Sequence, residues 1–358
     1  MLIYALKRLI SLVVTLVVGT FLVFTVAEIL PPHLDKNYNE CKLARDKLGQ
    51  FALQAQVDLL CDQLKLRDFA LTRYVRWLGV ITGVTADPMQ DPEFVKSSGL
   101  SLDIDKDCTG RYFCGKQYFG NLGFSITNNT PVNNIIWDRL GNTAKLAGVA
   151  FALIVPLSIL FGVLAGIREG GTMDRVISFF GIVAASIPEY ASGVFLVTIF
   201  VTLLGILPGS APMTTGAGWS IAQQMVLPVA VLVIYDGAYM VRMVRGSMAE
   251  VMNTAYIRTA ILKGLSMRAT VLRHALRNAM IAPFTVLILQ INWLISGVVV
   301  TESVFAYPGF GRMLLDASLR KDIQLIEAAT LIALGVAVIT QLISDLGYAL
   351  LNPRIRLR

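Results

Sequence analysis

Six long runs of apolar residues restrict what this chain can fold into. They cover residues 9–27, 146–167, 176–207, 225–241, 281–301 and 328–351, and none of them holds more than one charged residue. A helix rises about 1.5 Å per residue and the hydrocarbon core of a membrane is about 30 Å thick, so about 20 apolar residues cross it. Barrel strands need only about 10 residues of alternating polarity. The runs therefore predict an all-α membrane protein with six transmembrane helices.

The composition agrees with this interpretation. Of the 358 residues, 55% are hydrophobic and 15% are charged, whereas soluble domains average about 25% charged residues. An ordinary soluble enzyme, a disordered chain and a coiled coil are excluded. The run at 176–207 is longer than one crossing requires and contains Pro188. We expect it to be tilted, broken or overhanging.

The basic residues predict the orientation in the membrane. Lys7 and Arg8 precede the first run, and residues 242–280 hold seven basic residues against one acidic residue. Residues 31–140 hold 13 basic and 13 acidic residues. Because Lys and Arg accumulate on the cytoplasmic side, both termini and residues 242–280 are predicted to be cytoplasmic. The formal charge of +7 then belongs to that face and does not indicate a nucleic-acid partner.

Three parts follow from this orientation. Residues 1–30 form the cytoplasmic N-terminus and the first transmembrane helix, residues 31–140 an extracytoplasmic segment, and residues 141–358 a transport core of five transmembrane helices. The first run is too long for the apolar core of a cleavable signal, which spans roughly 7–15 residues, so we expect it to be retained. Within the outer segment, helices are expected in residues 43–66 and 72–78, and residues 83–117 are interpreted as an inserted loop.

All four cysteines lie in the segment predicted to be outside: Cys41, Cys61, Cys108 and Cys114. An even number of cysteines in an oxidising compartment indicates disulfides, and four cysteines allow three pairings. Proximity in sequence favours Cys41–Cys61 and Cys108–Cys114. A zinc site is the alternative, but neither gap has zinc-ligand spacing.

Residues 242–280 are the most informative loop. Apolar residues recur at helical spacing on both sides of Gly264, and glycine commonly ends a helix where the chain turns. The pattern predicts two basic amphipathic helices joined at a bend. Such helices either lie on anionic lipid or dock a cytoplasmic partner, and the pattern alone does not separate the two.

Specific motifs in this loop resemble those of a known family. Tyr256-Ile-Arg-Thr-Ala, Lys263-Gly-Leu and Arg273-His-Ala-Leu-Arg-Asn-Ala look like the coupling loop of the oligopeptide/dipeptide/nickel ABC importer permeases. Ile261-Leu262 departs from the Arg-Ala pair that is common there. Further matches occur in family order along nearly the whole chain, except in residues 83–117: Gly120-Asn-Leu-Gly-Phe-Ser, Asp138-Arg-Leu, Ser186-Ile-Pro, Leu207-Pro-Gly, Glu302-Ser-Val-Phe, Tyr307-Pro-Gly-Phe-Gly-Arg and Asn352-Pro-Arg-Ile-Arg.

The resemblance implies a function. The chain would be the permease subunit of an ATP-driven importer in a bacterial inner membrane. It would form half of the translocation pathway for peptides or peptide-like solutes. The expected partners are a second homologous permease, two cytoplasmic ATPase subunits, an extracytoplasmic binding protein and the lipid bilayer. The residues expected to couple to an ATPase are Tyr256, Arg258, Thr259, Ala260, Lys263, Gly264 and Leu265.

No cofactor is expected on the chain itself. The sequence lacks a Gly-x-x-x-x-Gly-Lys-[Ser/Thr] phosphate loop, so ATP and magnesium would belong to the partner ATPases and the chain would not be an enzyme. The sequence also shows no metal site. Peptides, nickel chelates, opines and sugars remain open as the solute.

Charged residues inside the predicted spans are candidates for the translocation path. An ionisable group in a membrane is costly and usually faces a protein interior or a water-filled cavity. Pro188 would break its helix next to Glu189, and Asp236 lies in the middle of its run. Glu189 could instead lie at the aqueous end of a long helix, and Asp236 could make a structural hydrogen bond.

Two other classes of function were considered. A membrane-embedded enzyme would need paired catalytic groups in its spans, and the runs hold no histidine and no Gly-x-Ser-x-Gly elbow. A secondary transporter would show an internal repeat of its spans, and no convincing repeat is present. Both are less consistent with the sequence than an importer permease.

Overall fold

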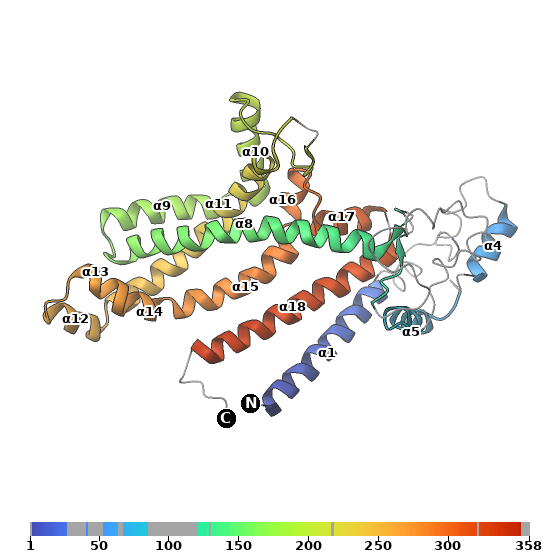
Figure 1. The fold of residues 1–358 in the computed structure, drawn as a ribbon, viewed down its shortest axis with the longest axis horizontal. Coiled ribbons are helices and arrows are strands. Elements are labelled where there is room, and N and C mark those ends of the chain that lie inside the picture. Colours follow the sequence, from blue (N-terminus) through green and yellow to red (C-terminus); the bar gives the residue numbers. More distant parts are fainter. Residues whose placement is uncertain are drawn as a thin grey trace. The chain divides into compact units, whose positions relative to one another are not determined.

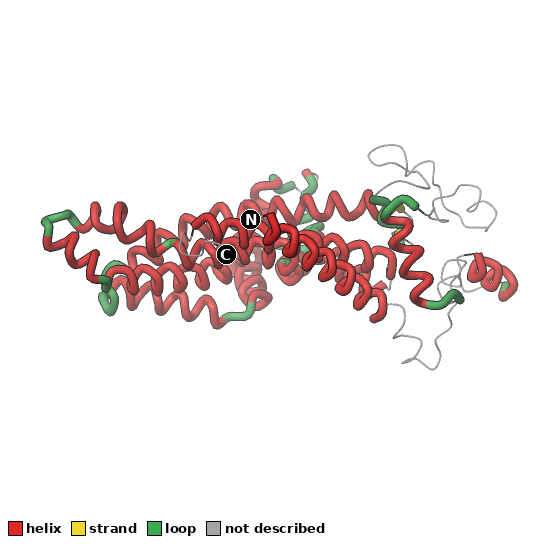
Figure 2. Tube along the Cα trace, turned by 90° about the horizontal axis from the view of Figure 1, so that it is seen from below, coloured by secondary structure: helices red, strands yellow, loops and turns green. Residues whose placement is uncertain are grey.

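The computed structural model is almost entirely helical (Figures 1 and 2). It describes residues 2–26, 41, 53–63, 67–84, 120–125, 127–128, 130–215, 218–320 and 322–351. The chain divides into two compact units. The first unit comprises Met1–Arg139 and Met313–Gly335, and the second comprises Leu140–Arg312 and Val336–Arg358.

Among the described residues, the first unit contains three complete helices and a small hairpin. These are α1 (Leu2–Phe24), α4 (Gln54–Gln63), α5 (Ala70–Ile81), β1 (Phe124–Ser125) and β2 (Thr130–Pro131). The two strands are antiparallel, with Phe124 opposite Pro131. Three further helices contribute residues to both units: α8 (Val132–Gly166), α17 (Phe310–Arg320) and α18 (Ile323–Leu351).

The second unit holds the remaining helices. They are α9 (Thr172–Ser186), α10 (Glu189–Val197), α11 (Ile221–Met252), α12 (Ala255–Leu262), α13 (Met267–Thr270), α14 (Leu276–Ala279), α15 (Ile281–Gly297) and α16 (Val299–Val304), with π-helical segments η3 (Thr198–Leu203) and η5 (Val271–Ala275). Their apolar core is built mainly from α8, α11 and the residues around α16. The core includes Leu146, Ile154, Leu232, Met240, Phe305 and Tyr307.

The apolar helices correspond to the predicted runs. Helices α8 and α11 and residues 323–343 of α18 are each long and apolar enough to cross a membrane. Helices α9 and α10 with η3 pass the same test as a pair that is bent by 98°, so the run at 176–207 is broken. Helices α1 and α15 cover the first and fifth runs, with shorter described apolar stretches at Val13–Phe24 and Ile281–Gln290. The count of six spans remains a prediction.

Two glycines allow α8 to approach α11 closely. A Cβ atom added to Gly162 would lie 2.5 Å from the Cβ of Val244, and one added to Gly166 would lie 2.6 Å from the Cβ of Met248. Residues four apart lie on the same face of a helix, so both glycines face α11. Small residues at such a contact let two membrane helices pack backbone to backbone.

A buried carboxylate, Glu302 of α16, connects α8 to the first turn of α17. Its side chain is completely buried. It accepts hydrogen bonds from the hydroxyl of Thr143 and, at 2.8 Å, from the backbone N–H of Arg312. The Thr143 oxygen accepts in turn from the backbone N–H of Phe310 at 2.7 Å. We call these four residues the Glu302 network.

Tyr307, in the loop between α16 and α17, makes a further contact with α8. It lies outside the apolar helices. It is fully buried, and its hydroxyl donates to the backbone carbonyl of Asn142 at 2.7 Å. Burial, and secondly the negative charge of Glu302, raise the pKa of Tyr307 to about 12. The phenol therefore stays protonated at physiological pH and remains a hydrogen-bond donor.

The contact between α8 and α11 predicts opposite effects for two glycines of the same helix. Gly162→Ala should lower the free energy of unfolding by about 1–3 kcal/mol, because the new methyl group overlaps Val244. Gly148→Ala is the matched control, since an added Cβ there meets nothing within 4 Å, and alanine should stabilise the helix by up to about 1 kcal/mol. Thermal unfolding of the detergent-solubilised chain measures both. Equal midpoints for the two variants would contradict the close approach.

The Glu302 network predicts a second difference. Thr143→Val should cost about 1–3 kcal/mol, because a buried carboxylate and a buried N–H each lose a partner. Thr285→Val is the control, since the exposed Thr285 hydroxyl bonds only the Ile281 carbonyl of its own helix, and the change should stay within about 0.5 kcal/mol. Comparable thermal midpoints for the two valine variants would show that the network does not stabilise the fold.

Candidate functional site

The residues between α11 and α15 fold into a compact group of short helices (Figure 1). Helix α12 ends at Leu262, and Gly264 then adopts a φ of +83°, which a residue without a Cβ atom accepts readily. Ser266 begins the next helix, where its hydroxyl accepts a hydrogen bond from the N–H of Ala269. The predicted pair of helices with a bend at Gly264 is therefore present.

The first of those helices starts later than the sequence pattern indicated. Residues 242–252 still belong to α11. The helix ends there, and Asn253 separates it from the start of α12. The hydroxyl of Thr254 donates to the Val251 carbonyl at 2.6 Å, which satisfies an acceptor at the end of α11. Helical periodicity on both sides of this break hid it in the sequence.

Helix α12 is anchored by a buried side. Ile257 is fully buried and belongs to a cluster with Met248 of α11 and Val271, Ala275 and Ala279 of the following segments. Ala260 is also buried. The amide of Asn278 donates to the Tyr256 hydroxyl at 2.8 Å, and the Ser247 hydroxyl donates to the Ala279 carbonyl at 2.6 Å. Movement of α12 would therefore be transmitted to α11 and α14.

The opposite side of α12 is exposed and both basic and apolar. We call it the α12 face, and it consists of Arg258, Thr259, Ile261, Leu262, Lys263, Gly264 and Leu265, which are all exposed. Leu262 is 81% exposed. Of the coupling residues predicted from sequence, Arg258, Thr259, Lys263, Gly264 and Leu265 lie on this face, Tyr256 lies beside it, and Ala260 points inward. Large apolar side chains exposed together mark a surface for binding another protein or lipid.

An ion pair that no sequence pattern indicates holds α11 to α9. The guanidinium of Arg245 in α11 binds both carboxylate oxygens of Asp174 in α9, at 2.9 and 2.7 Å. Asp174 is 4% exposed and also accepts from the N–H of Gly170 and the hydroxyl of Ser178. In the sequence, Arg245 is one of the seven basic residues of the 242–280 loop. The partners are 71 positions apart, so no local signal indicates their pairing.

The predicted path residues surround the bend between α9 and α10. Ile187 is extended, as expected before a proline, and Pro188 precedes the first turn of α10. The hydroxyl of Thr301 in α16 donates to the half-buried carboxylate of Glu189. Helix α10, which begins with Glu189, packs against α11, which carries Asp236.

Asp236 lacks a full set of partners. It is 4% exposed, and its Oδ2 atom has no hydrogen-bond partner among the described residues. Leaving a buried polar atom unpaired costs about 1–3 kcal/mol. The structural hydrogen bond that we considered for Asp236 does not involve this oxygen.

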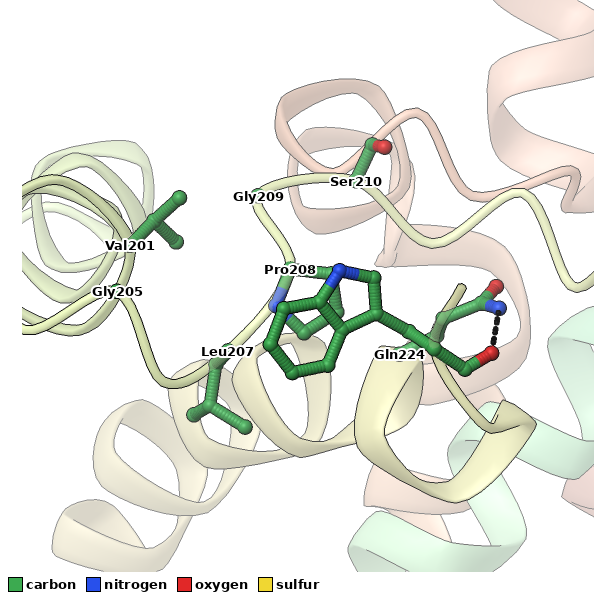
Figure 3. Close-up of a pocket in the computed structure, with 8 residues that line it drawn as sticks. Val201, Gly205, Leu207, Pro208, Gly209, Ser210 and Gln224 are labelled. Carbon is green, nitrogen blue, oxygen red and sulfur yellow. Dashed lines mark hydrogen bonds between the residues drawn. The ribbon is translucent and has the colours of Figure 1, made fainter. Parts of the chain in front are cut away.

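A cavity of about 350 Å³ opens between η3 and the start of α11 (Figure 3). Its walls are neutral and partly apolar, formed by Val201, Gly205, Leu207, Pro208, Gly209, Ser210, Trp219 and Gln224. The Gln224 side chain is occupied by the loop, since it accepts from the N–H of Met213 and donates to the carbonyls of Thr214 and Trp219. The cavity therefore has room for a small apolar group but offers no charge for binding an ion.

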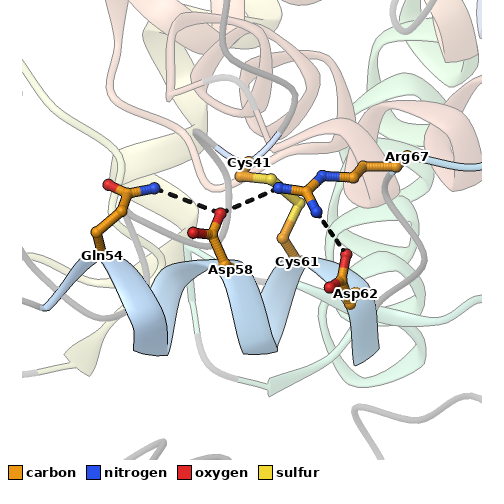
Figure 4. The surroundings of a disulfide bond; sticks show 6 residues. All are labelled: Cys41, Gln54, Asp58, Cys61, Asp62 and Arg67. Carbon is orange, nitrogen blue, oxygen red and sulfur yellow. Dashed lines mark hydrogen bonds and ion pairs between the residues drawn. A yellow bond between two sulfur atoms is a disulfide. The ribbon is translucent and has the colours of Figure 1, made fainter.

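One predicted disulfide is present in the first unit. Cys41 is bonded to Cys61 of α4, and both are buried (Figure 4). Next to it, the guanidinium of Arg67 binds two aspartates of α4 at 3.0 and 2.9 Å. Cys108 and Cys114 lie outside the described residues, as does the 85–117 part of the predicted loop at 83–117.

Comparison with known proteins identifies the family. The model of the binding-protein-dependent transport system inner membrane component matches residues 158–357. The probable peptide ABC transporter permease y4tP of Sinorhizobium fredii is 36% identical over 280 residues, which cover 77% of this chain and 88% of that protein. The oligopeptide transport system permease AppB of Bacillus subtilis is 35% identical over 245 residues, which cover 67% and 78% of the two chains.

A solved structure shares the fold. The methionine ABC transporter MetNI, in an inward-facing conformation, has a chain that aligns over 62% of this protein and 97% of its own length, with a TM-score of 0.52 and 14% identity. The resemblance found in the sequence motifs is thereby confirmed. The chain belongs to the family of binding-protein-dependent transport system inner membrane components, which are multi-pass proteins of the inner membrane.

Proposed function

We propose that this chain is the permease subunit of an ATP-driven importer for peptides or peptide-like solutes. The α12 face carries this proposal, because it joins an exposed surface suited to a partner to a buried side that is fixed to α11 and α14. Two relatives named as peptide or oligopeptide permeases support the class of solute. The chain would form half of the pathway and a second homologous permease the other half.

The proposed mechanism places the energy source outside the chain. Two cytoplasmic ATPases would bind ATP and magnesium, and the α12 face would bind in a groove on one of them. When ATP brings the ATPases together, this groove moves and the bound α12 moves with it. This works only if ATP favours one of two packings of the permease pair. An extracytoplasmic binding protein would deliver the solute.

The topology proposed for the membrane has six spans, with α1 as the first. Both termini and α12 would face the cytoplasm, and residues 31–140 would lie outside. The distribution of basic residues supports this orientation. The Cys41–Cys61 disulfide supports an oxidising, extracytoplasmic environment for its segment.

The translocation path is proposed to pass the bend at Pro188, beside Glu189 and Asp236. Two observations support this. A helix break in lipid is tolerated where it faces protein or a water-filled cavity. In addition, α10 and α11, which carry the two carboxylates, pack against each other, and one buried oxygen of Asp236 lacks a partner among the described residues.

A pull-down of the tagged chain in mild detergent, followed by mass spectrometry, tests the proposed function. Wild type should recover ATPase subunits and a second permease. Arg258→Glu with Lys263→Glu should reduce ATPase recovery by about tenfold or more, because both charges lie on the α12 face. Arg168→Glu with Arg175→Glu is the matched control, since both residues are exposed and lie outside α12. A chain recovered alone, or only with itself, would contradict the proposal.

The bend at Gly264 gives a sharper test of coupling. Gly264→Pro should abolish solute-stimulated ATP hydrolysis in the reconstituted complex, because proline fixes φ near −65° and the bend requires +83°. Gly264→Asn should retain most of the activity, since asparagine tolerates positive φ and an added Cβ meets nothing within 4 Å. Membrane insertion of both variants is the control. Normal hydrolysis in the proline variant would rule out a coupling role for this bend.

A further inference from the structure

Helix α5 carries an apolar arc that the rest of the chain covers only in part. Successive residues of a helix are about 100° apart. The apolar side chains of α5 therefore occupy nearly half of its circumference, while the basic ones gather on the other side. The arc contains Leu71, Tyr74, Val75, Trp77, Leu78 and Ile81. The opposite side contains Thr72, Arg73 and Arg76, together with one apolar residue, Val80, which is buried.

One part of the arc is covered by α1. Tyr74 is 4% exposed, and its hydroxyl lies 2.9 Å from the Thr20 hydroxyl and 3.2 Å from the Val17 carbonyl, to which it donates. Its ring packs edge-on against Phe21 and Phe24, with centroids 5.3 Å apart in both cases. Helix α5 is therefore held against the C-terminal third of α1.

The described residues do not cover the other part of the arc. Leu71 and Val75 are 51% and 60% exposed, and Phe69, which precedes the helix, is 77% exposed. The neighbouring surface of α1 is also apolar and exposed, as at Val18 and Leu22. Phe21 contacts Tyr74 and is itself partly exposed, so the apolar surface of α1 continues onto α5.

The depth of α5 in the membrane follows from the part of α1 that it contacts. Lys7 and Arg8 of α1 precede its apolar run, so the part of the helix that crosses the hydrocarbon core begins near residue 9 and its C-terminal end lies toward the outer side. The contact with Tyr74 involves residues from Val17 to Phe24, within about 11 Å of the C-terminal end of the helix. With α1 across the membrane, α5 lies at the boundary of the outer leaflet. Its 12 residues are too few to cross.

The polar side of α5 suits the same boundary. Arg76 forms an ion pair with Asp68, and Arg73 lies on the same side. Arginines there reach lipid phosphates while the apolar side enters the acyl region, and tyrosine and tryptophan are favoured at this depth. A helix in open water would instead leave Leu71 and Val75 hydrated.

We propose that α5 is an interfacial helix that buries Phe69, Leu71 and Val75 in the outer leaflet of the bilayer. The occupant of the exposed arc is therefore lipid, reached by continuity with the membrane-facing surface of α1. This inference rests on the proposed crossing of the membrane by α1. Its consequence is that the start of the extracytoplasmic segment is held at a fixed height on the membrane.

Quenching of tryptophan fluorescence by brominated phosphatidylcholine tests the inference in the full chain. The native tryptophans 77, 137, 219 and 293 are first replaced by phenylalanine. Single tryptophans are then introduced by Leu71→Trp and Thr72→Trp. These positions are adjacent and both exposed, but about 100° apart on the helix. Val18→Trp in α1 reports whether α1 lies in lipid.

Quenching is expected to be strong for Leu71→Trp and Val18→Trp. For Thr72→Trp it is expected to fall to about half of that value or below, because bromine quenches only over short distances in the acyl region. Equal quenching at positions 71 and 72, with Val18→Trp quenched, would overturn the inference and leave the proposed function intact. Loss of quenching at position 71 on assembly with the second permease would show that protein covers the arc and would also overturn it. An unquenched Val18→Trp would instead refute the membrane placement of α1.

Discussion

The absence of hydrogen-bonding solvent inside a membrane is the constraint on which this fold depends. Continuous helices satisfy their own backbone groups, so every break needs partners from elsewhere in the protein. At the start of α17, the buried carboxylate of Glu302 accepts a hydrogen bond from the N–H of Arg312, and the Thr143 hydroxyl accepts one from the N–H of Phe310. At the break before α10, Thr301 of a neighbouring helix binds the carboxylate of Glu189. Polar side chains from neighbouring helices thus accompany both of these breaks in the second unit.

Helix α11 collects the contacts that would transmit movement from α12. Within little more than one turn, Val244 meets Gly162 of α8, Arg245 binds Asp174 of α9, and Met248 packs against Ile257 of α12. A displacement of α12 therefore acts on a segment that is already fixed to two long helices. Packed interfaces of this kind shift between discrete arrangements and do not deform continuously, which is the property that a coupling element requires.

The sequence predicted what local patterns encode. The apolar runs predicted the long helices, Pro188 the break within the third run, and Gly264 the bend after α12. The end of α11 at Met252 was missed, because apolar periodicity continues across Asn253 and no glycine or proline marks the stop. Pairings between distant residues were missed as well. Thr143 and Glu302 are 159 residues apart, and neither side chain has a local feature that indicates its partner.

The buried acids of the second unit differ in how completely their oxygens are hydrogen-bonded. Glu302 and Asp174 are as buried as Asp236, but both are bound by donors from other parts of the chain. Their charge is used to hold segments together. Asp236 has an oxygen without a partner among the described residues. An unpaired buried oxygen opposes folding, and ionisable groups inside membrane spans concentrate at functional sites. Because Asp236 is buried in this conformation, a role in transport would require another packing of α10 against α11 to expose it.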